Sequence, residues 1–286
     1  MPMTTVADPL VSTAWLAEHL EAPDVRIVDA SWFMPGTPRD PKAEFLLAHI
    51  PGAVFFDIDE IADETSDLPH MLPSAIKFAS RVRKLGLGDG SRIVVYDSLG
   101  ILPAARVWWT FRAMGHEDVA VLDGGLPKWI ADGRPVEDGP PLAQERHFTP
   151  RLQADIIRSV EQMKTVVETG REQIIDARPA GRFTGETPEP RAGLRSGHMP
   201  GARNIPLGAM IAPDGTLLSA EKLAPVFEAA GVDLARPIVS TCGSGITASV
   251  VALALARLGR PRTAVYDGSW TEWGGREDTA VVTGEA

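Results

Sequence analysis

The 286-residue sequence is poor in cysteine and in long apolar runs, and each shortage excludes a class of protein. Its single cysteine, Cys242, cannot form a disulfide within the chain, so a disulfide-stabilised secreted fold is excluded and the reducing cytoplasm is the expected compartment. The longest apolar run, residues 250–256, is far shorter than the roughly 20 residues of a membrane-spanning helix. We therefore expect no membrane insertion.

Positive charge is also scarce. Lys and Arg number 28 against 38 Asp and Glu, which gives a formal net charge of -10. Such a chain repels phosphate backbones, and no local basic stripe offsets this, so no nucleic-acid partner is expected. The six histidines are scattered and form no ligand pair with the one cysteine. The sequence therefore predicts neither a metal site nor a bound cofactor.

What the sequence does contain is one pattern written twice. A length of 286 residues corresponds to about two domains, and four short motifs recur in the same order, 144 to 149 residues apart. The pairs are residues 25–30 and 173–178, 49–53 and 198–202, 93–97 and 238–242, and 121–125 and 265–269. This repeat predicts a duplicated domain, with halves at 8–135 and 154–286 joined by a Pro/Gly-rich linker at 136–153.

Each half alternates short β-branched runs with helical patterns. The predicted strands are 26–28, 93–95 and 120–122 in the first half, and 174–175, 237–240 and 264–266 in the second. Residues 104–114 and 246–258 have helical spacing and are each followed by a glycine. The pattern predicts an α/β fold in which each half is a parallel sheet with helices on both faces.

Cys242 falls just after a predicted strand, where parallel sheets place their reactive groups. The glycines that follow allow successive N–H groups to face one point, so we expect a backbone anion cup made by Gly243, Ser244, Gly245, Ile246 and Thr247. A cup of this kind favours the thiolate form of a cysteine. The alternative is a small buried apolar residue, but the order of strand, glycine turn and helix favours a nucleophile.

The segment Cys-Gly-Ser-Gly-Ile-Thr-Ala at 242–248 resembles the active-site loop of tandem-domain rhodanese-family sulfurtransferases, in particular the 3-mercaptopyruvate branch. The resemblance extends over nearly the whole chain, through motifs at 49–53, 55–59, 70–73, 106–109, 123–126, 175–178, 197–201 and 266–270. It implies two rhodanese-like domains, of which the second is catalytic. The first is expected to be non-catalytic, because Asp97 stands at the position of the cysteine.

The resemblance also implies the chemistry. Cys242 would take sulfur from 3-mercaptopyruvate as a persulfide, release pyruvate, and pass the sulfur to cyanide or to a thiol such as thioredoxin. Thiosulfate is the alternative donor, but it is a dianion and the thiosulfate branch carries basic residues just after the cysteine. Here those residues are the neutral Gly243 and Ser244, so we favour mercaptopyruvate.

Five further site residues follow from the family pattern. Arg182 and Arg191 match the positions that hold the substrate's carboxylate and carbonyl, a task suited to the forked guanidinium. Ser244, His70 and Asp59 match a proton relay in which the aspartate orients the histidine. The plainer interpretations are solvated arginines, a turn-capping histidine and a helix N-cap aspartate.

Two other functions fit the sequence less well. A cysteine-dependent phosphatase needs an arginine six residues after its nucleophile, where this chain has Ala248. A non-catalytic rhodanese-like binding module would not need the intact cysteine and both arginines.

His49 and His198 share one repeat position, so we expect both to be structural, and the adjacent Trp108 and Trp109 are expected in the core.

Overall fold

The computed structural model describes residues 8–285, so residue 286 of the predicted second domain lies outside it. The chain forms two compact units. The first contains the chain up to Glu64, Leu72–Gln153 and Pro213–Leu217; the second contains Thr65–Met71, Ala154–Ala212 and the chain from Leu218 onward. The predicted linker, 136–153, belongs to the first unit. Thr65–Met71 lies in the first half of the sequence but belongs to the second unit, and Pro213–Leu217 lies in the second half but belongs to the first unit.

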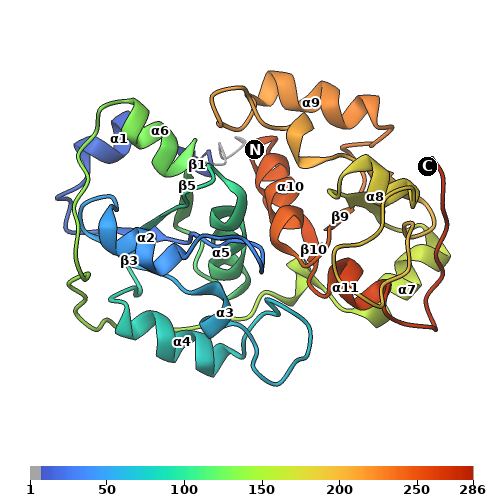
Figure 1. The fold of residues 1–286 in the computed structure, drawn as a ribbon, viewed down its shortest axis with the longest axis horizontal. Coiled ribbons are helices and arrows are strands. Elements are labelled where there is room, and N and C mark those ends of the chain that lie inside the picture. Colours follow the sequence, from blue (N-terminus) through green and yellow to red (C-terminus); the bar gives the residue numbers. More distant parts are fainter. Residues whose placement is uncertain (1–7, 286) are drawn as a thin grey trace, which may run out of the picture. The chain divides into compact units, whose positions relative to one another are not determined.

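The first unit is built on a five-stranded parallel sheet with the order β1-β5-β4-β2-β3. Helices flank this sheet (Figure 1). The strands are β1 (Leu10–Val11), β2 (Val25–Asp29), β3 (Ala53–Phe55), β4 (Arg92–Tyr96) and β5 (Val119–Leu122). The helices are α1 (Thr13–Glu18), α2 (Pro41–Leu47), α3 (Ile58–Ile61), α4 (Ala75–Lys84), α5 (Leu102–Ala113) and α6 (Gly125–Ala131).

The second unit repeats this topology with the order β6-β10-β9-β7-β8, again all parallel. Its strands are β6 (Ile157–Arg158), β7 (Gln173–Asp176), β8 (Ala202–Asn204), β9 (Ile238–Thr241) and β10 (Ala264–Tyr266). Its helices are α7 (Val160–Thr169), α8 (Ala180–Thr184), α9 (Ala220–Ala229), α10 (Ile246–Arg257) and α11 (Ser269–Trp273), with 3-10 turns at Ala154–Ile156 and Leu207–Ala209. The predicted fold class is confirmed, and every predicted strand is present. The prediction missed the four short edge strands β1, β3, β6 and β8.

The helices that follow the two central strands are buried on nearly all sides. In α10, every residue from Ala248 to Ala256 is buried, as its apolar composition around the whole helix requires. In α5, Trp108 and Trp109 are each 1 % exposed, which confirms their place in the core. Gly115 and Gly259 follow the caps of these helices in the left-handed conformation, at φ 85° and 80°. Within residues 8–285, no helix combines the length and apolarity needed to cross a membrane.

His49 and His198 make the same contacts in the two units. Nδ1 of His49 lies 2.7 Å from the Phe45 carbonyl, and its ring stacks on Phe45 at 4.0 Å. Nδ1 of His198 lies 2.9 Å from the Phe183 carbonyl, and its ring stacks on Phe183 at 3.7 Å. Both histidines are buried. These matching buried contacts agree with the expected structural role.

Asp97 directly follows β4, and its carboxylate fills the turn that leads into α5. Oδ1 accepts the N–H groups of Leu99 and Gly100, each at 2.7 Å, and Oδ2 accepts that of Ala104 at 2.8 Å. Complete burial raises the pKa of the Asp97 carboxyl to about 6, although the three backbone donors act to lower it. In the first unit, an anion of the chain itself therefore occupies the place of the nucleophile.

The burial of Asp97 predicts a pH-dependent stability. Because its folded pKa lies above the ordinary value of 3.8, the group's favourable contribution is complete below about pH 4 and is lost as pH rises through about 6. Relative to Asp97→Asn, the wild type should therefore lose about 3 kcal/mol of unfolding free energy between about pH 4 and pH 7. Urea unfolding across this range measures the difference. The exposed Asp138→Asn serves as the control, and a wild-type-minus-variant difference that does not change with pH would contradict the assignment.

Candidate active site

Cys242 lies in a tight turn between β9 and α10. Gly245, the N-cap of α10, adopts φ 84°, a left-handed conformation that favours glycine and bends the chain back over the sulfur. Its N–H donates to Sγ of Cys242 at 3.2 Å. Ile246 and Thr247 open the helix, and the N–H groups of a first helical turn have no acceptor within the helix. The turn therefore brings the Gly245 N–H to the sulfur, and the wider anion cup of residues 243–247 stays a prediction.

The first turn of α11 is hydrogen-bonded to the backbone of this loop. The N–H of Trp270 donates to the Cys242 carbonyl at 2.9 Å, and the N–H of Cys242 donates to Oγ of Ser269 at 3.3 Å. Ser269 in turn donates to the Tyr266 carbonyl at 2.8 Å and holds an unusual φ of 49°. Because the N–H of Gly243 points opposite to the Cys242 carbonyl across the planar peptide, it faces away from α11.

The two predicted arginines lie together beside this loop. A Cβ atom at position 243 would stand 3.2 Å from Nη2 of Arg182 and 3.9 Å from Nη1 of Arg191. Arg182 comes from α8, whereas Arg191 comes from the loop that follows it. Cys242 itself is 1 % exposed, but Gly243 and both arginines are partly exposed. The site therefore reaches solvent on the arginine side.

A buried carboxylate that the sequence did not single out orients one of these arginines. Glu189, whose side chain is 1 % exposed, pairs through Oε1 with Nη1 of Arg178 at 2.7 Å. Through Oε2 it accepts hydrogen bonds from Nε of Arg182, at 3.1 Å, and from Nη2. Arg191 makes no ion pair with any residue between 8 and 285. Glu189 thus partly neutralises Arg182, and the net positive charge of the site comes from Arg191.

Arg178 anchors the network to the sheet. It pairs with Asp176 at 2.6 Å, and its guanidinium lies 4.0 Å above the ring of Trp270. Burial lowers the pKa of Arg178, but Asp176 and Glu189 outweigh this and raise it above its usual value. The sequence does show a glutamate, Glu189, between the arginines at 182 and 191. It does not show that the side chain of Glu189 is buried.

The structure places the three predicted relay residues as follows. Asp57, not Asp59, is the N-cap of α3, so the interpretation of Asp59 as an N-cap is wrong. Oδ2 of Asp59 instead accepts the indole N–H of Trp32 at 2.8 Å. His70 is buried with φ 62° and belongs to the second unit, as does the buried Ser244, whereas Asp59 belongs to the first. The relay remains a prediction.

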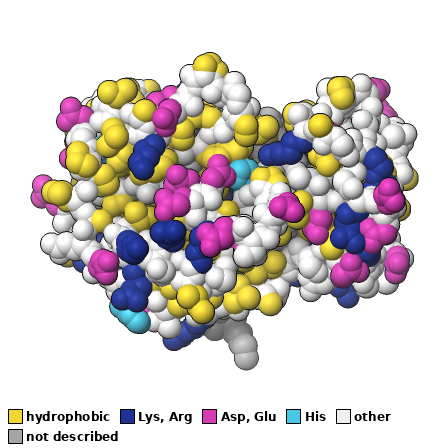
Figure 2. All heavy atoms as spheres, turned by 60° about the horizontal axis from the view of Figure 1, so that its bottom comes forward, with side chains coloured by type: hydrophobic (Ala, Val, Ile, Leu, Met, Phe, Trp, Pro, Cys, Tyr) yellow, Lys and Arg dark blue, Asp and Glu magenta, His cyan; other side chains and the backbone are white. Residues whose placement is uncertain are grey.

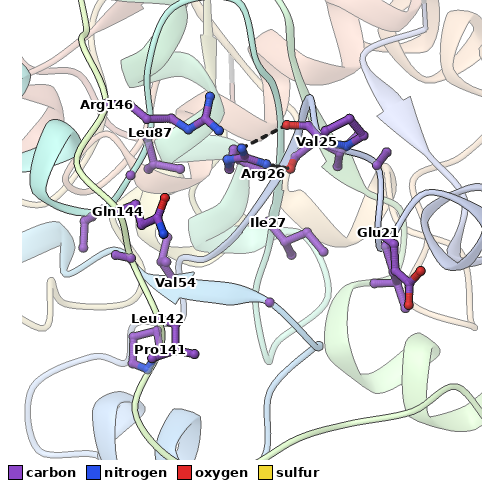
Figure 3. A pocket seen from close by; sticks show the side chains of 17 residues that line it. Glu21, Val25, Arg26, Ile27, Val54, Leu87, Pro141, Leu142, Gln144 and Arg146 are labelled. Atoms are coloured by element: carbon purple, nitrogen blue, oxygen red, sulfur yellow. Dashed lines mark hydrogen bonds between the residues drawn. The ribbon is translucent and has the colours of Figure 1, made fainter.

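A cavity in the first unit lies apart from the predicted site residues. A cavity of about 660 Å³ opens in the first unit near the start of β2, lined by Arg26, Val54, Leu87 and Arg146 among others (Figure 3). It contains none of the predicted site residues.

Among residues 8–285, no group of three or more His, Cys, Asp or Glu could hold a metal ion. Figure 2 shows Lys and Arg side chains interspersed with Asp and Glu on the face it presents.

Comparison with known proteins agrees with the geometry. The model of the rhodanese-like domain matches residues 12–132 and 159–276. Human 3-mercaptopyruvate sulfurtransferase is 44 % identical over 92 % of this chain and 91 % of its own, and bovine thiosulfate sulfurtransferase is equally similar, at 44 % over the same shares. The crystal structure of SseA from Escherichia coli, described as a 3-mercaptopyruvate sulfotransferase, superposes with a TM-score of 0.84 at 41 % identity, covering 91 % of this chain and 98 % of that one.

With a match in each half and close relatives along nearly its full length, the chain is a sulfurtransferase of the tandem-domain rhodanese family, in the branch that holds the 3-mercaptopyruvate enzymes.

Proposed function

We propose that the protein transfers sulfur from 3-mercaptopyruvate, through a persulfide on Cys242, to a thiol or cyanide acceptor, with release of pyruvate. The observation that carries this proposal is the convergence on one loop of a cysteine, a backbone N–H that contacts its sulfur and two arginines. The donors suit a sulfur anion, and the arginines suit a 2-oxo acid. The names of the relatives support the same donor.

In the first half-reaction the Cys242 thiolate attacks the sulfur atom of mercaptopyruvate. The new S–S bond forms as the C–S bond breaks, and the electron pair of that bond passes to carbon as the enolate of pyruvate. The proton of the donor thiol passes to the enolate carbon, so pyruvate leaves and Cys242 is left as the persulfide anion. Arg191 and Arg182 hold the carboxylate and the carbonyl oxygen, where the enolate charge gathers, so their contribution is made at both binding and bond cleavage.

In the second half-reaction the acceptor attacks the outer sulfur. A thiolate yields an acceptor persulfide and cyanide yields thiocyanate, and each returns Cys242 to its thiolate form. Ser244, His70 and Asp59 are the residues we propose for the proton transfers of the first step. Thioredoxin is the kind of small thiol protein that fits the acceptor role. A free cysteine nucleophile suits a reducing compartment, and we place the protein in the cytoplasm.

Thiosulfate is the second candidate donor. Bovine thiosulfate sulfurtransferase is as similar to this chain as human 3-mercaptopyruvate sulfurtransferase is, and two arginines beside Gly243 supply positive charge. However, the loop itself carries no basic side chain, and Glu189 already compensates Arg182. One uncompensated arginine matches the single carboxylate of mercaptopyruvate better than the two charges of thiosulfate.

Intact-mass spectrometry after exposure to mercaptopyruvate tests the proposed function. The wild type should gain the mass of one sulfur atom and release an equal amount of pyruvate, because the persulfide persists when no acceptor is present. Cys242→Ser should do neither. An unmodified wild-type mass with no pyruvate would refute the proposal.

Replacing each arginine separates their roles. Arg191→Ala should raise KM for mercaptopyruvate about 10- to 100-fold, the range for a lost charged hydrogen bond. Arg182→Ala should raise it less, because Glu189 already shares that charge. Steady-state kinetics measure both, with Arg171→Ala, half exposed in the same unit, as the control. A KM unchanged in both site variants would remove the arginines from substrate binding.

Donor preference is checked by side-by-side kinetics on one preparation. We expect kcat/KM for mercaptopyruvate to exceed that for thiosulfate by about tenfold or more, which corresponds to one charge interaction made with only one donor. Raising the ionic strength should weaken thiosulfate turnover further. A larger kcat/KM for thiosulfate would replace the first candidate by the second.

A further inference from the structure

Thr271 contacts the cysteine loop twice through one acceptor. Its backbone N–H donates to the Gly243 carbonyl at 2.9 Å, and its hydroxyl donates to the same oxygen at 2.7 Å. Thr271 is the third residue of α11, directly after Trp270, whose N–H holds the Cys242 carbonyl. Two successive carbonyls of the loop are therefore fixed by two successive residues of one helix.

A hydrogen bond that fixes a carbonyl also fixes the direction of the N–H in the same peptide group. In a planar trans peptide, the N–H of a residue points opposite to the carbonyl of the residue before it. The bonds from Thr271 to the Gly243 carbonyl therefore turn the N–H of Ser244 away from α11. This is the direction in which Trp270 already turns the N–H of Gly243. Without the Thr271 bonds, this second peptide would be free to rotate and the Ser244 donor could leave the cup.

The non-catalytic half of the same chain lacks this second bond. Its first bond is present, because the N–H of Leu126 donates to the Asp97 carbonyl at 2.9 Å, as Trp270 does to Cys242. The next residue is Pro127, which stands 144 positions before Thr271 and has neither an N–H nor a hydroxyl to offer. The repeat thus keeps one bond in both halves and adds the second only where a nucleophile stands.

We propose that Thr271 is a positioning residue for the persulfide chemistry of Cys242. By clamping the Gly243 carbonyl it holds the N–H of Ser244 in the anion cup, where it stabilises the thiolate and the persulfide anion. The proposal rests on the proposed function for its catalytic meaning. Thr271 itself touches neither donor nor acceptor, so its effect falls on the reactivity of the sulfur and not on the binding of mercaptopyruvate.

Two variants test the clamp. Thr271→Val keeps the N–H and removes the hydroxyl, so the rate of persulfide formation in a single turnover should fall about three- to tenfold. Thr271→Pro removes both donors and should lower it about 10- to 100-fold. Pro127 shows that the corresponding place in α6 accepts a proline. In both variants, KM for mercaptopyruvate should stay within about twofold of the wild type, because neither arginine is changed.

A readout that needs no sulfur donor distinguishes failure of the clamp from failure of the proposed function. The pH dependence of Cys242 alkylation by iodoacetamide should move to higher pH in Thr271→Val and further in Thr271→Pro. Thr165→Val is the matched control, since the Thr165 hydroxyl also donates to a backbone carbonyl, that of Glu161 in α7, and it should leave the profile unchanged.

If Thr271→Pro does not fold, Thr271→Val alone decides the question. Unchanged alkylation profiles and persulfide rates in the folded variants would overturn the proposal, as would a loss confined to KM. A wild type that is alkylated normally but forms no persulfide would instead count against the proposed function.

Discussion

Each half of the chain has the same hydrogen bond behind its central turn. The carbonyl of the residue after the middle strand, β4 or β9, accepts a hydrogen bond from the helix after the next strand, α6 or α11. Leu126 supplies this bond to Asp97, and Trp270 supplies it to Cys242, each at 2.9 Å. Because the peptide is planar, the bond decides which way the next N–H faces. In the first half the donors of the turn close on the Asp97 carboxylate. In the second half the corresponding turn surrounds a sulfur atom, and the Gly245 N–H meets it.

The site combines an uncharged cysteine loop with positively charged side chains from a separate segment. The cysteine loop has no charged side chain, and its sulfur is contacted by the backbone N–H of Gly245, a dipole that needs no counter-ion. The positive charge comes from α8 and the loop after it, where Glu189 fixes Arg182 and leaves Arg191 uncompensated. A neutral cup and one uncompensated arginine suit a donor that carries one carboxylate next to its carbonyl.

Much of this arrangement could be predicted from the sequence, because repeats and buried strands leave strong periodic signals. The six central strands, the two buried helices and the position of Cys242 all follow from such patterns. The edge strands do not, since β1 and β6 have two residues each and β3 and β8 have three. Asp57 and Asp59 stand two residues apart, and only the φ angles and hydrogen bonds of the turn show that Asp57 caps the helix.

The supporting residues of the site were harder to predict. Glu189 contacts arginines 7 and 11 residues before it, but its local pattern does not distinguish a buried glutamate from a solvated one. Thr271 contacts Gly243, 28 residues away, and its local pattern does not distinguish it from a residue on a helix surface. The exchange of the short segments Thr65–Met71 and Pro213–Leu217 between units likewise depends on tertiary packing that periodicity does not record. His70 lies in the first of these segments.

The central claim is that the peptides after Cys242 are held with their N–H groups around its sulfur. A high-resolution crystal structure of the protein soaked with 3-mercaptopyruvate tests it most directly. The account predicts a persulfide whose outer sulfur lies within hydrogen-bond distance of at least three backbone nitrogens between Gly243 and Thr247. An outer sulfur that points out of the turn, or one held by side chains alone, would contradict it.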